Sequence, residues 1–297
     1  MQASPGLKSL IRGRIIARVQ REQQQQKLWE PEEDFHETIR LKLDGLNDSN
    51  QFWNFTRCGH EQIYKTCKHC GRFESLKYRC NIKWCPNCQQ RITNTRRRLI
   101  ELWTQKIVQP KHLVLTQQNF HVLTRRSIRQ MIKSLARLRR HKCFAGVHGG
   151  CISIEITNEG NGWHLHSHWL IDAKWLDMPE ISRAWAALVG QKFAICKVKD
   201  CRGKDYLQEI TKYVAKGSEI ASWPPETINE FVTAIRGLRF FFAFGSLHAL
   251  APAIRRELQA QKPPPPICEC GESDFVYESE TNAVLHELRE INRRRRS

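Results

Sequence analysis

Three histidines alternate along one short segment, WHLHSHWLI, at positions His164, His166 and His168. Alternate side chains of a β-strand point to the same face, so a strand over 163–171 would present all three imidazoles together. Neutral imidazoles on one rigid strand are good ligands for a divalent metal ion. A solvated polar strand face is the alternative, but it explains one histidine more easily than three. The pattern therefore predicts a metal site.

A second strand-like segment, CISIEIT over 151–157, precedes the histidines. The intervening NEGNG has the residues of a tight turn, so the two segments are expected to form a hairpin. The facing strand would carry Glu155, which could supply a carboxylate to the same ion. Imidazole suits transition metals and carboxylate suits Mg²⁺ or Mn²⁺, so the mixed set leaves the ion open.

A helical segment further along, YLQEITKYVAKG, places a carboxylate and a phenol on one face. Glu209 and Tyr213 are four residues apart, Lys216 lies about one turn further on, and Tyr206 lies two turns back. A phenol is a poor nucleophile at its ordinary pKa of about 10, unless a cation polarises the electrophile. Taken alone, the segment is better explained as an amphipathic helix with a core tyrosine and solvated charges.

Six cysteines fall between Cys58 and Cys88. The pairs Cys67-x2-Cys70 and Cys85-x2-Cys88 have a spacing that allows convergence on one tetrahedral Zn²⁺. Such a closed set of four thiolates would make the zinc structural, and buried free thiols are the alternative. A second site could use the nearby Cys58, His60 and Cys80. The remaining six are expected to be small core residues: Cys143, Cys151, Cys196, Cys201, Cys268 and Cys270.

The charge balance is strongly basic, with 48 Lys and Arg against 30 Asp and Glu, a net of +18. A surplus of this size favours a polyanionic partner such as nucleic acid. Residues 91–142 hold fourteen Lys and Arg against one acid, Glu101. A solvated face is the usual alternative, but so one-sided a run indicates phosphate contacts. The candidate DNA-binding residues are Arg96, Arg97, Arg98, Arg125, Arg126, Arg129, Arg139 and Arg140.

The longest apolar stretch, 240–250, is interrupted and shorter than the ~20 residues that span a bilayer, so no membrane partner is expected. No export signal is evident at the N-terminus, which favours a cytoplasmic protein with reduced or metal-bound cysteines.

The elements that must position these residues can also be read from periodicity and turn residues. Strands are expected at 112–116, 151–157 and 163–171, and helices at 91–108, 127–142, 177–190 and 205–216. We expect the α+β class, with a central antiparallel sheet of about five strands and helices packed on one face. The cysteine cluster precedes this core.

The order of an HLVLT strand, a hairpin ending in HLHSH and a helix with EITKYVAK resembles the rolling-circle replication initiators of small plasmids, members of the His-hydrophobic-His (HUH) endonuclease superfamily. The resemblance covers about 58–217 and is closest to the branch with one tyrosine and a glutamate. His166 and His168 match the paired metal histidines and His164 matches an additional upstream histidine. Ser167 departs from the bulky apolar residue of the family name.

The resemblance implies a role for each residue of the helix. Tyr213 matches the nucleophile, Glu209 the residue that activates water at termination, and Lys216 the lysine that follows the tyrosine. It also places Glu155 near the metal. Tyr206 leaves a two-tyrosine scheme open.

The implied activity is a metal-assisted nick in one strand of the double-stranded origin, which yields a 5′-phosphotyrosine and a 3′-OH primer. The implied cofactors are Mg²⁺ or Mn²⁺, beside structural Zn²⁺. The implied partners are plasmid origin DNA, single-stranded at the nick, with host helicase and single-strand binding protein. The alternatives are a single-tyrosine HUH transposase or relaxase and, in another class, a non-catalytic zinc-dependent DNA-binding regulator.

The resulting domain prediction has five parts. They are a basic and polar tail (1–50), a zinc-binding cysteine cluster (51–92), an HUH-type, RRM-like nuclease core (93–225), a C-terminal extension of that core (226–262), and a linker with a charged tail (263–297).

Overall fold

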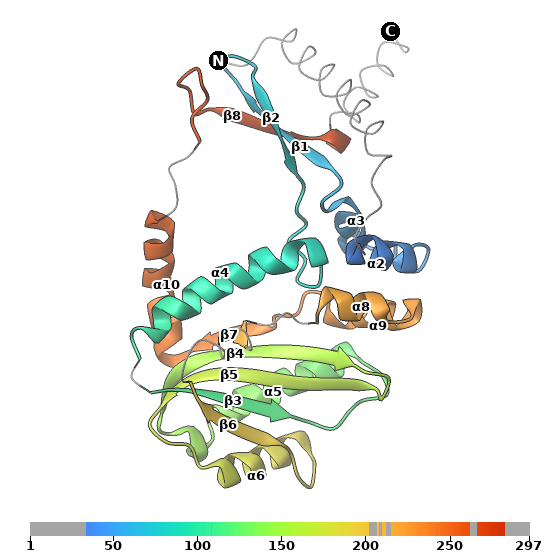
Figure 1. Cartoon of the computed structure of the whole chain (residues 1–297). Coiled ribbons are helices and arrows are strands. Elements are labelled where there is room, and N and C mark those ends of the chain that lie inside the picture. The colour runs from blue at the N-terminus through green and yellow to red at the C-terminus, as the bar shows by residue number, and fades with distance from the viewer. Residues whose placement is uncertain are drawn as a thin grey trace. The chain divides into compact units, whose positions relative to one another are not determined.

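The computed structural model of the chain describes residues 34–107, 109–201, 207, 210–211, 215–261 and 266–282. Two compact units account for these residues, and each is discontinuous in the sequence. The first unit includes 48–80 and 266–282, and the second includes 35–47 and 81–261, apart from the gaps named above. Figure 1 shows the elements of both.

The first unit is built on a three-stranded antiparallel sheet with β1 at its centre. Its elements are α3 (Asn50–Arg57), β1 (Gln62–Cys67), β2 (Phe73–Lys77) and β8 (Phe275–Ser279). Helix α3 begins at Ser49, whose hydroxyl accepts a hydrogen bond from the N–H of Phe52. Strand β8 comes from 263–297, the segment expected to be a linker and a charged tail, so part of that segment completes a sheet.

The second unit contains a five-stranded sheet in the order β6-β3-β5-β4-β7, and every neighbouring pair in it is antiparallel. The strands are β3 (Pro110–Thr116), β4 (Val147–Asn158), β5 (Trp163–Ala173), β6 (Cys196–Asp200) and β7 (Phe241–Phe244). The expected α+β class with a central antiparallel sheet is confirmed. The three strands expected from the sequence form its centre.

The helices of this unit begin and end where local residues favour it. They are α2 (Phe35–Leu43), α4 (Pro86–Thr104), α5 (Arg125–Leu138), a 3₁₀ turn (Lys142–Phe144), α6 (Met178–Val189), α8 (Gly217–Ser222), α9 (Pro225–Ile235) and α10 (Gly245–Ala260). Thr124 and Ser127 form a reciprocal capping box at the start of α5. Helix α6 begins at the Asp177 cap and ends at Gly190, which has a left-handed φ of +71°.

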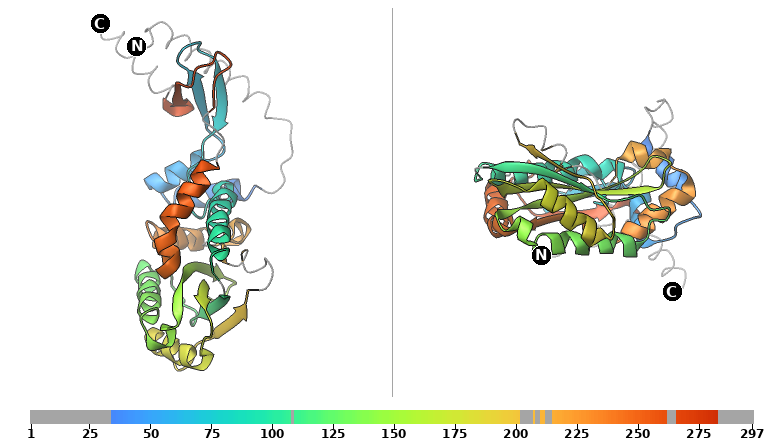
Figure 2. Two further views of the ribbon diagram at one scale, coloured as in Figure 1. Left: turned by 90° about the vertical axis from the view of Figure 1, so that its left-hand side faces the viewer. Right: turned by 90° about the horizontal axis from the view of Figure 1, so that it is seen from below.

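Side chains alternate between the two faces of β5, and helices cover both faces. Leu170 belongs to a core cluster with residues of α4 and α10, including Leu99, Trp103 and Leu247. Trp169 points the other way, toward Phe144 and Phe244. Figure 2 shows α5 and α6 across that second face, so the expected helical layer is joined by one on the opposite side.

No helix in the part of the chain that the structure describes is both long and apolar enough to cross a membrane.

Gly150 marks a place where β4 and β5 tolerate no side chain. A Cβ added there would collide with the backbone carbonyl of Leu170, whereas one added at Gly146 would meet nothing within 4 Å. We expect Gly150→Ala to lower the free energy of unfolding by roughly 3 kcal/mol or more, because backbone must move. Gly146→Ala is the matched control and should change it little. Urea unfolding of both variants measures this, and equal stability would contradict the β4–β5 packing.

Candidate functional site

A carboxylate and two imidazoles converge on the central strands β4 and β5. Glu155 lies directly opposite His166 in the antiparallel ladder, so their side chains share one face. The Oε2 atom of Glu155 lies 2.6 Å from Nε2 of His166 and 3.1 Å from Nε2 of His168. The Glu155 side chain is only 6% exposed. The three residues form a group that can hold a metal ion.

The chemistry of this donor set fits a divalent cation. Two imidazole nitrogens and a carboxylate oxygen suit Mn²⁺ or Mg²⁺ as well as transition metals. Among the described atoms, Nδ1 of His166 is buried without a hydrogen-bond partner. A cation would also neutralise the buried carboxylate, which water reaches poorly.

His164 lies beside this group but outside it. Its ring centroid is 5.1 Å from that of His166, and the metal-competent set contains Glu155, His166 and His168 alone among the four residues expected there. Partial burial, aided by the neighbouring His166, lowers the pKa of His164. The ring therefore favours the neutral form, as an auxiliary ligand would require.

A fourth histidine, His112 on β3, contacts the ring nitrogen of His168 that does not face Glu155. Its Nε2 lies 3.3 Å from Nδ1 of His168, and both rings are buried and stacked. If Nε2 of His168 ligates a metal, its Nδ1 carries the proton and can donate to His112. The sequence showed His112 only as the start of a core strand. In HLVLT it shares a face with the half-buried Val114 and Thr116 and not with the buried Leu113 and Leu115, so the pattern carried no signal for its role.

Tyr206, Glu209 and Tyr213 lie outside the described residues. Some described residues between and after them contact α4. Leu207 and Ile210 are buried in the cluster with Leu99, Ile100 and Trp103 of α4, and these anchors lie on both sides of Glu209 in the sequence.

Gln89, a buried residue in the first turns of α4, holds the chain just beyond Tyr213. Its Nε2 donates to the carbonyl of Ala215 at 2.6 Å, and its Oε1 accepts from the N–H of Gly217 at 3.2 Å. One side chain thus holds the backbone on both sides of Lys216, whose own side chain is exposed.

Helix α8, which begins after Lys216, contacts the end of strand β4, the strand of Glu155. Glu219 accepts a hydrogen bond from the N–H of Asn158, and Trp223 donates its indole N–H to the carbonyl of the same residue. Burial raises the pKa of the Glu219 carboxyl, and the charge of Glu155 raises it further, against the opposing N–H of Asn158 and Lys216. The segment after Tyr213 is thus joined by hydrogen bonds to the strand that carries Glu155.

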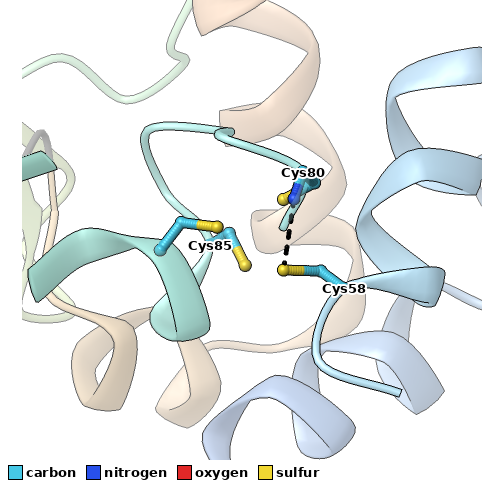
Figure 3. A group of neighbouring side chains, drawn as sticks. Cys58, Cys80 and Cys85 are labelled. Carbon is cyan, nitrogen blue, oxygen red and sulfur yellow. Dashed lines mark hydrogen bonds between the residues drawn. The ribbon is translucent and has the colours of Figure 1, made fainter. Parts of the chain in front are cut away.

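Cysteines of each unit stand close together in the sequence or the fold. In the first unit, the N–H of Cys80 donates to Sγ of Cys58 at 3.4 Å (Figure 3). In the second unit, Cys85 and Cys88 lie at the start of α4. A group of four within the first unit can hold a metal ion, namely Cys67, Cys70, Cys268 and Cys270.

This grouping differs from the one expected from spacing, in which Cys67 and Cys70 would join Cys85 and Cys88. The pairing of β8 with β1 brings the loop before β8 beside Cys67 and Cys70, and Cys268 and Cys270 of this loop are their partners instead. Among the residues that the structure describes, His60 is not part of a metal-competent group. Burial is the main cause that raises the pKa of Cys143 and Cys196 to about 11 and that of Cys151 to about 12, so these three are neutral thiols, as core residues would be.

Of the eight candidate DNA-binding arginines, four contact other residues of the second unit and four are exposed. The first four make the following contacts. Arg96 lies over the ring of Phe241, Arg97 pairs with Glu101, Arg125 donates to the carbonyl of Arg236, and Arg139 lies over the ring of Phe244. Burial lowers the pKa of Arg96 and Arg139. The exposed four are Arg98, Arg126, Arg129 and Arg140.

Replacing His112 by phenylalanine tests its support of His168. Phenylalanine keeps an aromatic ring but has no nitrogen to accept a hydrogen bond from His168. We therefore expect Mn²⁺ affinity to fall by about tenfold to a hundredfold with the fold retained. Electron paramagnetic resonance titration of Mn²⁺ measures this, with circular dichroism to check folding. His148→Phe changes an exposed histidine of β4 outside the group and should leave the affinity unchanged. Equal Mn²⁺ affinities in the two folded variants would show that His112 does not support the metal-binding role of His168.

Comparison with known proteins identifies the family to which the strands and helices just described belong. No curated protein and no solved structure matches the chain. A family model described as a replication protein matches residues 75–264, well over half of the 297 residues. This stretch contains the Glu155, His166 and His168 group, helix α4 and the segment that α4 holds. The chain therefore belongs to the replication-protein family that initiates rolling-circle replication of plasmids.

Proposed function

We propose that this protein nicks one strand at the double-stranded origin of its plasmid through attack by Tyr213. The observation that supports this most is the buried group of Glu155, His166 and His168 on adjacent strands. The hold of α4 on Ala215 and Gly217 adds to it, because it fixes the chain two residues beyond Tyr213.

Each residue has a distinct task in the proposed reaction. Glu155, His166 and His168, with His164 nearby, would hold Mg²⁺ or Mn²⁺, which when bound withdraws charge from the scissile phosphate. The Tyr213 oxygen attacks phosphorus and the bond to the 3′-oxygen breaks, leaving a 5′-phosphotyrosine and a 3′-OH primer. Lys216 contacts the phosphate. After one round Glu209 directs water at the phosphate of the regenerated origin, whose bond to the 3′-oxygen breaks to release the strand. The strand is rejoined instead when a free 3′-OH attacks the phosphotyrosine and the Tyr213 oxygen leaves.

The family match favours a replication initiator over a transposase or a relaxase with the same kind of site. The proposed DNA is single-stranded at the nick. Host helicase and single-strand binding protein would act on the opened origin. The proposed location of the reaction is the cytoplasm, where the plasmid lies. Structural zinc is proposed for the cysteines, since four thiolates leave no position open for substrate.

The exposed face of α5 is the proposed contact with duplex DNA. Four exposed cations lie along it at helical spacing, namely Arg126, Arg129, Lys133 and Arg137, and the exposed Arg140 follows just after its end. Helix α5 contains no acid, so nothing on it offsets this charge. Phosphate contacts of this kind supply affinity without sequence preference.

Removing the hydroxyl of Tyr213 separates an enzyme from a DNA-binding regulator. We expect Tyr213→Phe to lower nicking by a factor of about a thousand or more, with origin binding unchanged, because only the nucleophile is lost. The assay incubates a labelled single-stranded origin oligonucleotide with protein and Mn²⁺ and resolves the covalent product on a denaturing gel. Tyr206→Phe is the matched control and should nick normally. Nicking that survives in Tyr213→Phe and disappears in Tyr206→Phe would move the nucleophile.

Neutralising the α5 face tests the duplex contact. We expect the triple variant Arg126→Ala, Arg129→Ala, Lys133→Ala to weaken origin-duplex binding and to reduce the slope of log affinity against log salt by roughly 3. Fluorescence anisotropy at several salt concentrations measures both, and nicking of saturating oligonucleotide should persist. Lys192→Ala, Arg255→Ala, Arg256→Ala removes the same charge from exposed positions elsewhere. An equal loss of duplex affinity in both triple variants would show that the effect comes from net charge and not from the α5 face.

A further inference from the structure

Two loops of the first unit have the same local design, although they are far apart in the sequence. In each, a glycine with a left-handed φ follows the second cysteine directly, Gly71 at +71° and Gly271 at +87°. Each glycine N–H donates back to the carbonyl of the first cysteine, at 3.0 Å to Cys67 and 2.8 Å to Cys268. Such tight turns bring two thiols of one loop to the same side.

The four thiols of the two loops face one another. Sγ of Cys67 lies 3.6 Å from that of Cys270, and Sγ of Cys70 lies 3.5 Å from that of Cys268. A tetrahedral ion with metal–sulfur bonds of about 2.3 Å would place its sulfurs about 3.8 Å apart. The observed spacing is thus close to that of a four-thiolate metal site.

Contacts that involve no sulfur hold the loops opposite each other. Strand β1 pairs with β8 so that Cys67 lies opposite Phe275. Beyond the ladder, the N–H of Lys68 donates to the carbonyl of Asp274 at 3.0 Å, and its ammonium pairs with the Asp274 carboxylate at 2.9 Å. Arg72 and Glu269 form a further ion pair between the loops. The convergence of the thiols therefore follows from backbone pairing.

The sheet that carries these loops buries very little. Within β1 the only buried hydrophobic side chains are Tyr64 and Cys67, and no residue of β2 or β8 is buried. A three-stranded sheet of this size lacks the core that would stabilise it alone, and small modules of this kind commonly rely on a metal. The sheet needs a crosslink, and the four thiols are placed to provide one.

We propose that Cys67, Cys70, Cys268 and Cys270 bind one structural zinc ion that fastens strand β8 to the β1–β2 hairpin. Four thiolates in tetrahedral arrangement select zinc over Mg²⁺ or Mn²⁺ and leave no coordination position for chemistry. The C-terminal segment of the chain is thereby part of a metal-dependent module, distinct from the nicking site and independent of it.

Zinc content of the full-length protein tests the site. We expect Cys268→Ser, Cys270→Ser to contain about one zinc ion per chain fewer than the unaltered protein, by inductively coupled plasma mass spectrometry. Cys143→Ser, Cys196→Ser removes two partly buried thiols that belong to no metal-competent group of the described residues and should lose none. Unchanged zinc in the first variant would overturn the proposal, and iron in place of zinc would overturn the identity of the ion.

Alkylation of the unaltered protein gives a second test that needs no variant to fold. Cys70 and Cys270 are exposed, so as free thiols they would react with iodoacetamide at once. With zinc bound, we expect all four cysteines to react at least about tenfold more slowly, and to lose this protection when a chelator is added. Peptide mass spectrometry reads each cysteine separately. Rapid alkylation of Cys268 and Cys270 in zinc-loaded protein would show that they hold no metal.

Discussion

The antiparallel pairing of β4 with β5 is the constraint on which the site depends. It runs from Val147 and Ala173 at one end to Asn158 and Trp163 at the other, and it sets Glu155 opposite His166. A slip of one residue would turn every histidine to the face covered by α5 and α6. Gly150, which fits only without a side chain, and the bulge between Val147 and Gly149 mark the other end of the same ladder. The group of donors is therefore a consequence of register.

Helix α4 connects three features that are separate in the sequence. Its N-terminal turn carries Cys85 and Cys88, and Gln89 follows at once. Gln89 holds the backbone of Ala215 and Gly217, while the far end of the helix packs Leu99 and Trp103 into the core around Leu170. Helix α4 therefore joins its N-terminal cysteines to the segment that follows the proposed nucleophile.

Local patterns could predict the parts of this arrangement that are themselves local. Alternation identified β4 and β5, and the Asp177 cap with Gly190 delimited α6. Contacts across long sequence separations could not be predicted. Cys67 and Cys270 are 203 residues apart, and only the pairing of β8 with β1 joins them. His112 likewise looks like an ordinary strand residue until β3 is placed beside β5, because its partner His168 lies 56 positions away.

The basic segment 91–142 contributes helices to both faces of the five-stranded sheet. Helix α4 packs on the side of Leu170 and the histidines, whereas α5 lies on the side of Trp169, so the five-stranded sheet separates their arginines. Duplex DNA on the proposed contact face of α5 would therefore lie on the opposite side of the sheet from Glu155, His166 and His168. The strand proposed to be cut would have to leave the duplex and pass an edge of the sheet to reach them. This geometry gives a physical reason for the proposed single-stranded substrate, and it makes binding and cutting separable tasks of one fold.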